Sequence, residues 1–186
     1  YNREFSRDFE PSRYGSTDNY YYQMCSVIRY FKGVSKPEND SSKGIEINHD
    51  FSQWSDVTPI FYDYVGDTSK RNHSDTSGQI VYVNETGRND IVESRFTYDS
   101  SYVYFYAKTK MPLTDYTDPN WMLLFIDIDN DKSTGWEGYD YLINQYVVDE
   151  NLTVISKYQN NLWQEIGLVE YSAKENDLHL RIPRSV

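Results

Sequence analysis

The sequence predicts a mainly β protein, an antiparallel β-sandwich that follows a single N-terminal helix. After residue 44 the apolar residues alternate with period two, and turn-forming residues separate the alternating segments at short intervals. Aromatic residues make up 17% of the 186-residue chain, with 19 tyrosines, and strands favour aromatic side chains. Many short strands with regular turns and no intervening helices are typical of a sandwich.

The predicted helix runs from Thr17 to Phe31, where the apolar residues follow a helical spacing. Thr17 or Asp18 can cap its start, and Gly33 can end it. Residues 34–44 are polar and rich in turn formers, which predicts a linker. We therefore divide the chain into an N-terminal helical segment at residues 1–33, a linker at 34–44 and a β module at 45–186. The apolar positions of the helix are Tyr20, Met24, Val27, Ile28 and Phe31.

Within the β module, the segment from Ser101 to Met111 alternates most plainly. It places Val103 and Phe105 on one face and Tyr104 and Tyr106 on the other. The segment Trp121–Asp129 is apolar on both faces, which predicts a central strand covered on both sides. The other expected strands are Ile60–Tyr64, Gln79–Val83, Ile91–Tyr98, Tyr139–Val148, Leu152–Tyr158, Trp163–Tyr171 and Leu178–Ile182.

The formal net charge of −11 excludes several classes of partner. Nucleic acid and anionic membrane surfaces are polyanions that such a chain repels, so neither is an expected partner. A neutral polysaccharide or a metal ion is compatible with this charge. No apolar run is long enough to span a bilayer, so no membrane insertion is expected. Cys25 is the single cysteine, so the chain forms no internal disulfide.

Acidic residues alternate at the end of one predicted strand, at Asp127, Asp129 and Asp131. Such clusters supply the hard oxygen ligands of Ca²⁺, which takes roughly six to eight of them. The pattern is not an EF-hand, because Lys132 stands where that loop has Gly and Gly138 where it has a bidentate Glu. Two interpretations stay open: a Ca²⁺ site, or a hairpin whose Asp and Asn side chains bond their own backbone. A catalytic pair is disfavoured, because carboxylates on one strand face run parallel rather than converge.

The four tryptophans fall in different settings. Trp136 stands between glycines in a loop, which indicates an exposed stacking platform or, alternatively, a ring packed over the hairpin. Trp121 follows an Asp-Pro-Asn turn and begins a predicted strand near a loop edge. Trp54 and Trp163 are expected in the core or at its rim.

Two polar loop segments, Arg71–His73 and Gly87–Asp90, can offer clustered hydrogen-bond donors and acceptors. Arg71 and Arg88, with the neighbouring amides of Asn72 and Asn89, suit vicinal hydroxyls or a carboxylate. The alternative is an Arg–Asp pair that only holds the loops together. No Gly-x-Ser-x-Gly elbow, phosphate loop or zinc-type Cys/His spacing is present, so we do not expect this chain to be an enzyme.

From Ile45 onward the chain carries several recognisable motifs in a fixed order over about three quarters of its length. They are Phe51–Val57, Gly66–Thr68, Arg71–His73, Thr86–Ile91, Tyr98–Phe105 and Asp118–Asp140. With these motifs the chain resembles the carbohydrate-binding modules of family 9 and the wider DOMON-like β-sandwich group. The resemblance implies that aromatic rings stack on a sugar while amide and acidic groups fix its hydroxyls. Trp121 and Trp136 match motif positions, and Tyr139 lies in the same motif.

The first 33 residues are similar to the closing segment of a barrel-type glycoside hydrolase region in secreted bacterial proteins, and the chain reads as a piece of a longer protein. The expected function is a non-catalytic carbohydrate-binding module of a secreted, periplasmic or cell-surface bacterial protein. Its expected partners are a polysaccharide or oligosaccharide and a preceding catalytic domain. The first alternative is a module that braces a glycoside hydrolase without binding sugar. The second is a DOMON-like domain that holds haem between a Met and a His.

Overall fold

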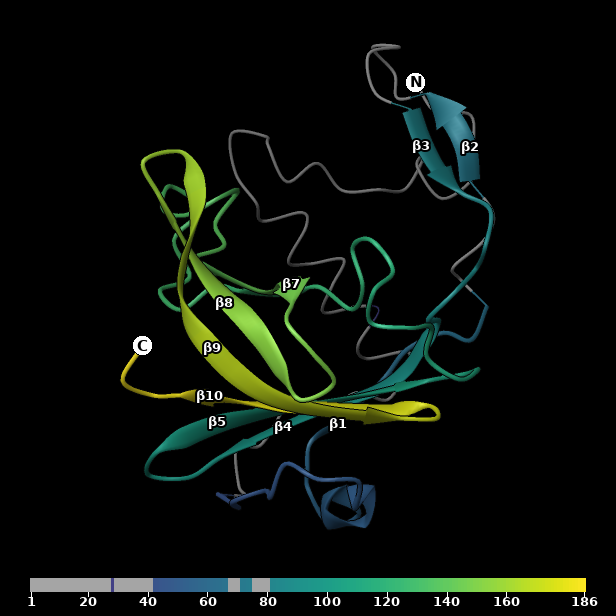
Figure 1. Ribbon diagram of the computed structural model, residues 1–186, viewed down its shortest axis with the longest axis vertical. Coiled ribbons are helices and arrows are strands. Elements are labelled where there is room, and N and C mark those ends of the chain that lie inside the picture. The colour runs from purple at the N-terminus through teal and green to yellow at the C-terminus, as the bar shows by residue number, and fades with distance from the viewer. Residues whose placement is uncertain (1–27, 29–41, 67–70, 75–80) are drawn as a thin grey trace. The chain divides into compact units, whose positions relative to one another are not determined.

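The computed structural model describes residues 28, 42–66, 71–74 and 81–186, and within them the fold is mainly β (Figure 1). The helix predicted at Thr17–Phe31 lies outside the described residues, apart from Ile28, as does most of the predicted linker. Of that linker, Ser42 forms a bridge to Tyr98 and Lys43 donates to the Thr97 hydroxyl through its backbone N–H. Residues 42–44 therefore pack as part of the β module.

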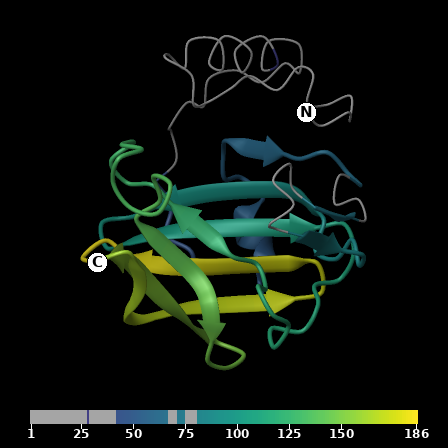
Figure 2. The same cartoon turned by 90° about the horizontal axis from the view of Figure 1, so that it is seen from above.

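Eight antiparallel strands form one continuous, curled sheet (Figures 1 and 2). Across the sheet their order is β1 (Ile60–Tyr62), β4 (Ile91–Tyr98), β5 (Tyr102–Thr109), β10 (Asp177–Pro183), β9 (Leu162–Lys174), β8 (Leu152–Gln159), β7 (Tyr141–Val147) and β6 (Leu124–Ile126). Four of the seven neighbouring pairs are joined by a short turn, whereas longer stretches of chain separate β1 from β4, β6 from β7 and β5 from β10. The β4 bounds coincide with those predicted, and the antiparallel, mainly β expectation is confirmed.

A separate two-stranded sheet consists of β2 (Arg71–Ser74) and β3 (Val81–Asn84), which pair antiparallel. Strand β3 overlaps the strand expected at Gln79–Val83. Strand β2 was expected to be a polar loop, and this expectation is wrong. Its four residues are Arg, Asn, His and Ser, which give no apolar alternation for a sequence pattern to detect.

The faces of the eight-stranded sheet bury two hydrophobic clusters. Ile143, Ile155 and Leu180 anchor the larger one, against which Phe105 packs. Tyr104 and Tyr106 of the same strand, β5, belong to the other cluster with Trp54. Successive side chains of β5 therefore enter different clusters, as the alternation in Ser101–Met111 predicts.

Trp54 is placed by a short 3₁₀ helix, η2 (Phe51–Trp54), whose start is capped by the Asp50 carboxylate. The indole stacks on Tyr106 at 5.3 Å, and its Nε1 donates to Nδ1 of the fully buried His179 at 3.0 Å. Nε2 of His179 then carries the proton and donates to the Asn48 carbonyl at 2.8 Å. Burial lowers the pKa of His179 to about 4, so the ring is neutral near pH 7. The expectation that Trp54 is a core residue is confirmed.

The segment Trp121–Asp129 is not the central strand that its apolar faces predict. Only Leu124–Ile126 is extended, and this strand lies at the edge of the sheet, bonded to β7 alone among the described strands. The backbone of Asn120 and Met122 has positive φ, at 56° and 44°, which breaks an extended conformation before the strand can begin. Local backbone geometry therefore overrides the apolar pattern.

Candidate functional site

Five aromatic side chains gather where strands β6, β8 and β9 meet the loop of residues 127–140. We call them the aromatic surface: Phe125, Trp136, Tyr139, Tyr158 and Trp163. Phe125 is the centre, with ring centroids 5.5 Å from Trp136, 5.4 Å from Tyr139 and 6.0 Å from Trp163. Tyr158 is the cross-strand partner of Trp163 and packs against it edge to face. Trp136 is 43% exposed and Tyr139 37%, so both offer ring area to a ligand.

The loop presents Trp136 and Tyr139 through a tight backbone bridge. The N–H of each residue donates to the carbonyl of the other, at 2.8 and 2.9 Å. Gly135 makes this turn possible, because its φ is 62° and a Cβ there would lie 2.1 Å from the Tyr139 carbonyl oxygen. Gly138 has a φ of 94° in the same turn. The glycines on either side of Trp136 are thus what hold the exposed ring in place.

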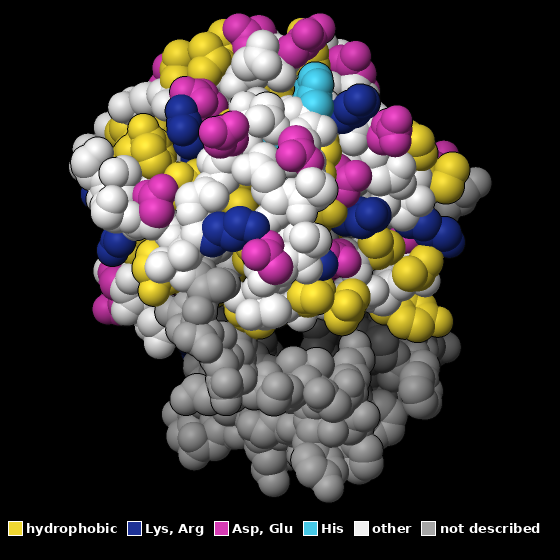
Figure 3. All heavy atoms as spheres, turned by 90° about the horizontal axis from the view of Figure 1, so that it is seen from below, with side chains coloured by type: hydrophobic (Ala, Val, Ile, Leu, Met, Phe, Trp, Pro, Cys, Tyr) yellow, Lys and Arg dark blue, Asp and Glu magenta, His cyan; other side chains and the backbone are white. Residues whose placement is uncertain are grey.

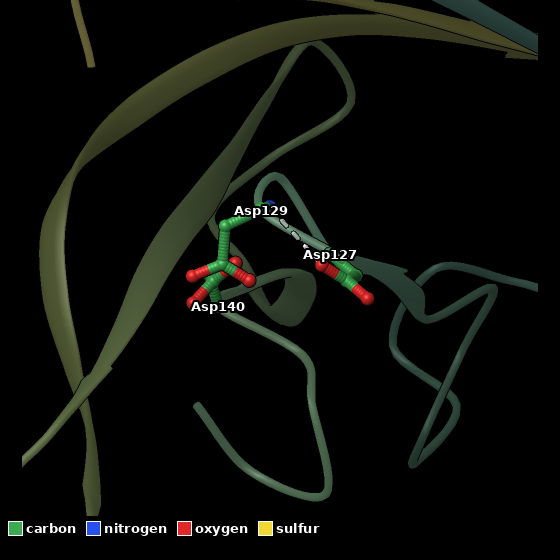
Figure 4. A group of neighbouring side chains, drawn as sticks. All are labelled: Asp127, Asp129 and Asp140. Carbon is green, nitrogen blue, oxygen red and sulfur yellow. Dashed lines mark hydrogen bonds between the residues drawn. The ribbon is translucent and has the colours of Figure 1, made fainter. Parts of the chain in front are cut away.

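Three carboxylates converge at the two ends of the same loop, from Asp127, Asp129 and Asp140 (Figure 4). One oxygen from each lies within 4.8 Å of the others. In Figure 4 the carboxylates of Asp129 and Asp140 lie side by side, and a dashed line joins the Asp129 N–H to Asp127. Asp140 reaches this position because its N–H donates to the Ile126 carbonyl, which brings the end of the loop back beside its beginning.

Asp131, which the sequence pattern placed in the acidic group, is not part of this triad. Its Oδ1 instead accepts hydrogen bonds from the Ser133 N–H and hydroxyl, and these bonds lower the pKa of the Asp131 carboxyl. Asp140 takes its place although it is nine positions further along the chain. The loop reversal that moves it there depends on positive-φ residues, so alternation along one strand could not reveal it.

The carboxylates of the loop also bond their own backbone, as the hairpin interpretation predicts. Oδ1 of Asp127 accepts from the N–H groups of Asp129 and Asn130, and Oδ1 of Asp129 accepts from Asp131. Oδ2 of Asp140 accepts from Ile128. The Thr134 hydroxyl also donates to both oxygens of Asp129. These bonds fix the loop, and since each carboxylate oxygen has two lone pairs they do not prevent it from binding a cation.

The remaining predicted site residues serve other contacts. Trp121 is only 2% exposed, and its Nε1 donates to the Thr114 carbonyl, so its ring belongs to the core rather than to an open surface. Arg88 pairs with Asp118 and donates to the Pro119 carbonyl.

Asn89 exchanges two hydrogen bonds with Thr114, so the segment around Arg88 and Asn89 braces the loop that precedes Trp121. Asn72 of β2 donates to the carboxylate of Glu85, which directly follows β3. The Arg71 side chain lies outside what the structure describes.

Basic side chains are scattered rather than gathered on the face drawn in Figure 3, where they alternate with acidic ones. Several are paired, as in Lys43–Asp56 and Arg181–Glu170. Among the described residues, no helix is long and apolar enough to cross a bilayer.

No protein-family model, curated protein or solved structure matches this chain.

Proposed function

We propose that this chain is a non-catalytic carbohydrate-binding module that engages sugars on the aromatic surface. The observation that carries the proposal is the exposed indole of Trp136, which stands in a turn that Gly135 permits and packs against the ring of Phe125. A pyranose ring has an apolar C–H face that packs on such an indole. The exposed carboxylates of Asp127 and Asp129 belong to the same loop and can accept hydrogen bonds from sugar hydroxyls.

The arrangement favours a single stacking surface over a sandwich of two parallel rings. Trp136 and Trp163 are 6.4 Å apart but inclined at 61°, so they do not present parallel faces to a ring between them. A sugar would therefore lie on Trp136 with Tyr139 beside it. Such a surface is suited to a chain of sugar units, because it covers one face of the ligand and leaves the neighbouring units unobstructed.

Replacing Trp136 with alanine is expected to weaken oligosaccharide binding by roughly tenfold or more, since buried aromatic contacts dominate such interfaces. A glycan array first selects the oligosaccharides, and isothermal titration calorimetry then measures the loss of affinity. Tyr146→Ala is the matched control, because Tyr146 is an exposed aromatic residue on β7 outside the aromatic surface. Equal affinity of the Trp136 variant and the wild type, or no binding to any glycan, would contradict the proposal.

We further propose that Asp127, Asp129 and Asp140 bind Ca²⁺. Two oxygens that both coordinate one Ca²⁺ at about 2.4 Å can be at most about 4.8 Å apart, and these carboxylates meet that limit. A bound ion would neutralise the repulsion among the three charges and tie the two ends of the loop together. The ion would act electrostatically. It would stabilise the loop that presents Trp136.

Ca²⁺ is therefore expected to raise the melting temperature of the wild-type protein, because a ligand that binds only the folded state stabilises it. At a concentration of about 100 times the dissociation constant, the gain is about 2.7 kcal/mol. Differential scanning calorimetry with and without Ca²⁺ measures it. Asp129→Asn should abolish the shift and Asp131→Asn should retain it. A shift that Asp131→Asn removes equally would place the ion elsewhere.

The wider setting is proposed on the resemblance alone. The module would belong to a secreted, periplasmic or cell-surface bacterial protein whose preceding catalytic domain acts on a polysaccharide. Haem ligation by His179 has less support, because both ring nitrogens of this buried side chain are already engaged by Trp54 and Asn48.

A further inference from the structure

A cavity of about 380 Å³ lies between three connections of the sheet, formed by other residues than the aromatic surface. Its walls come from the loop after β5, the β7–β8 turn and the β9–β10 turn, with His49 from the segment before η2. Leu113, Tyr116 and Ala173 supply apolar lining, and the edges of Trp121 and Tyr171 close the cavity where it meets the core. Its volume is within the range of about 300–1,000 Å³ typical of small-molecule sites.

The walls of this cavity are held in place by hydrogen bonds between segments that are distant in sequence. The Leu113 N–H donates to the Glu175 carbonyl, and the Trp121 Nε1 donates to the Thr114 carbonyl. The Tyr171 hydroxyl donates to the Asp149 carbonyl at 2.7 Å, which ties β9 to the β7–β8 turn. The cavity is thus a preformed feature of the fold.

The charge around the cavity is predominantly negative. Three acidic side chains line it, those of Asp115, Glu150 and Glu175, together with two basic ones, Lys174 and His49. The pKa of the Tyr171 hydroxyl is raised by burial first, and further by Tyr116, Asp149, Glu150 and Asp115. The carboxylates of Asp115 and Glu150 therefore lie close enough to the Tyr171 hydroxyl to act on it.

We propose that this cavity binds a small organic cation, an ammonium group carried on an apolar body. The ammonium would face the carboxylates of Asp115 and Glu150, and the apolar body would pack on Leu113, Tyr116 and Ala173. Anionic ligands are excluded by like-charge repulsion, and a neutral ligand would gain only the apolar contact. This site is independent of sugar binding on the aromatic surface.

Cyclohexylammonium and its neutral counterpart cyclohexanol are the probes for this inference. In amide-resolved NMR titrations, cyclohexylammonium should shift the signals of Leu113, Ala173 and the Trp121 indole in a saturable manner. Cyclohexanol should bind roughly tenfold more weakly, as expected when a charge–charge attraction is lost at a partly exposed site. Equal affinity for the two probes, or unmoved signals at these residues, would overturn the proposal.

The Glu150→Gln variant tests whether the carboxylates at the cavity attract the ammonium group. It should weaken cyclohexylammonium binding by roughly threefold, because the attraction to one partly exposed carboxylate is small. Glu165→Gln removes the same charge from an exposed position on β9 that does not line the cavity, and should leave the affinity unchanged. An equal loss in both variants would mean that net charge alone attracts the probe, and would contradict a site in this cavity.

Discussion

Replacing Trp54 with alanine is expected to lower the free energy of unfolding by about 4 kcal/mol. The indole is 2% exposed, stacks on Tyr106 and fills the centre of the smaller hydrophobic cluster. Its removal leaves a cavity and also strips Nδ1 of the buried His179 of its hydrogen-bond donor. Because small domains are stable by only about 5–15 kcal/mol, this loss removes a large share of the total stability. Urea denaturation at 25 °C measures the difference.

Two variants separate the contributions to this loss. Trp54→Phe keeps most of the apolar volume but removes the bond to His179, so it should cost less than the alanine variant. Trp136→Ala removes the same residue type from a position that is 43% exposed, and should change the unfolding free energy by a much smaller amount. Equal losses at Trp54 and Trp136 would show that Trp54 does not anchor the cluster.

Acidification from pH 6.5 to pH 4 is expected to destabilise the fold through His179. The unfolded chain takes up a proton near the ordinary histidine pKa of 6.5, whereas burial holds the folded-state pKa at about 4. The unfolded state therefore binds more protons in this window, and stability falls as the pH falls. A difference of that size corresponds to roughly 3 kcal/mol, fully present above pH 6.5 and lost by about pH 4.

The pH window distinguishes this effect from that of the carboxylates. Asp56, Asp99 and Asp115 have pKa values lowered below 3.8 by hydrogen bonds, so their contribution begins to be lost only below about pH 5. His179→Gln keeps a donor and an acceptor at the position without a titrating group. In this variant the unfolding free energy should be flat between pH 6.5 and about pH 5. An unchanged slope in the variant would assign the effect to other residues.

The strands could be predicted where apolar and polar residues alternate within one segment and its backbone is regularly extended. Strand β4 has the predicted bounds, and β5 divides its side chains between two clusters as expected. Strand β6 was misjudged because positive φ at Asn120 and Met122 cannot be read from an apolar run. Strand β2 was missed because its pairing with β3, rather than any pattern of its own, makes it a strand.

The candidate site was only half visible in the sequence for a similar reason. Trp136 and Tyr139 stand in a glycine-rich loop, which can be recognised from the sequence alone. Phe125 and Trp163 join them only through the pairing of β6, β7, β8 and β9, which depends on register across the sheet. Asp140 likewise enters the acidic group through the reversal of the loop. Contacts between residues that are far apart in the sequence leave no pattern in either segment that would predict them.

The most direct test of the carbohydrate-binding proposal follows an oligosaccharide titration through the four tryptophan indole N–H signals in NMR spectra. The indole signals of Trp136 and Trp163 should shift in a saturable manner, since both rings belong to the aromatic surface. The indole signals of Trp54 and Trp121 should not shift, because both rings are buried. Their Nε1 groups donate hydrogen bonds to His179 and to the Thr114 carbonyl. Binding that leaves Trp136 unmoved, or that shifts Trp121 instead, would contradict a sugar site on the aromatic surface.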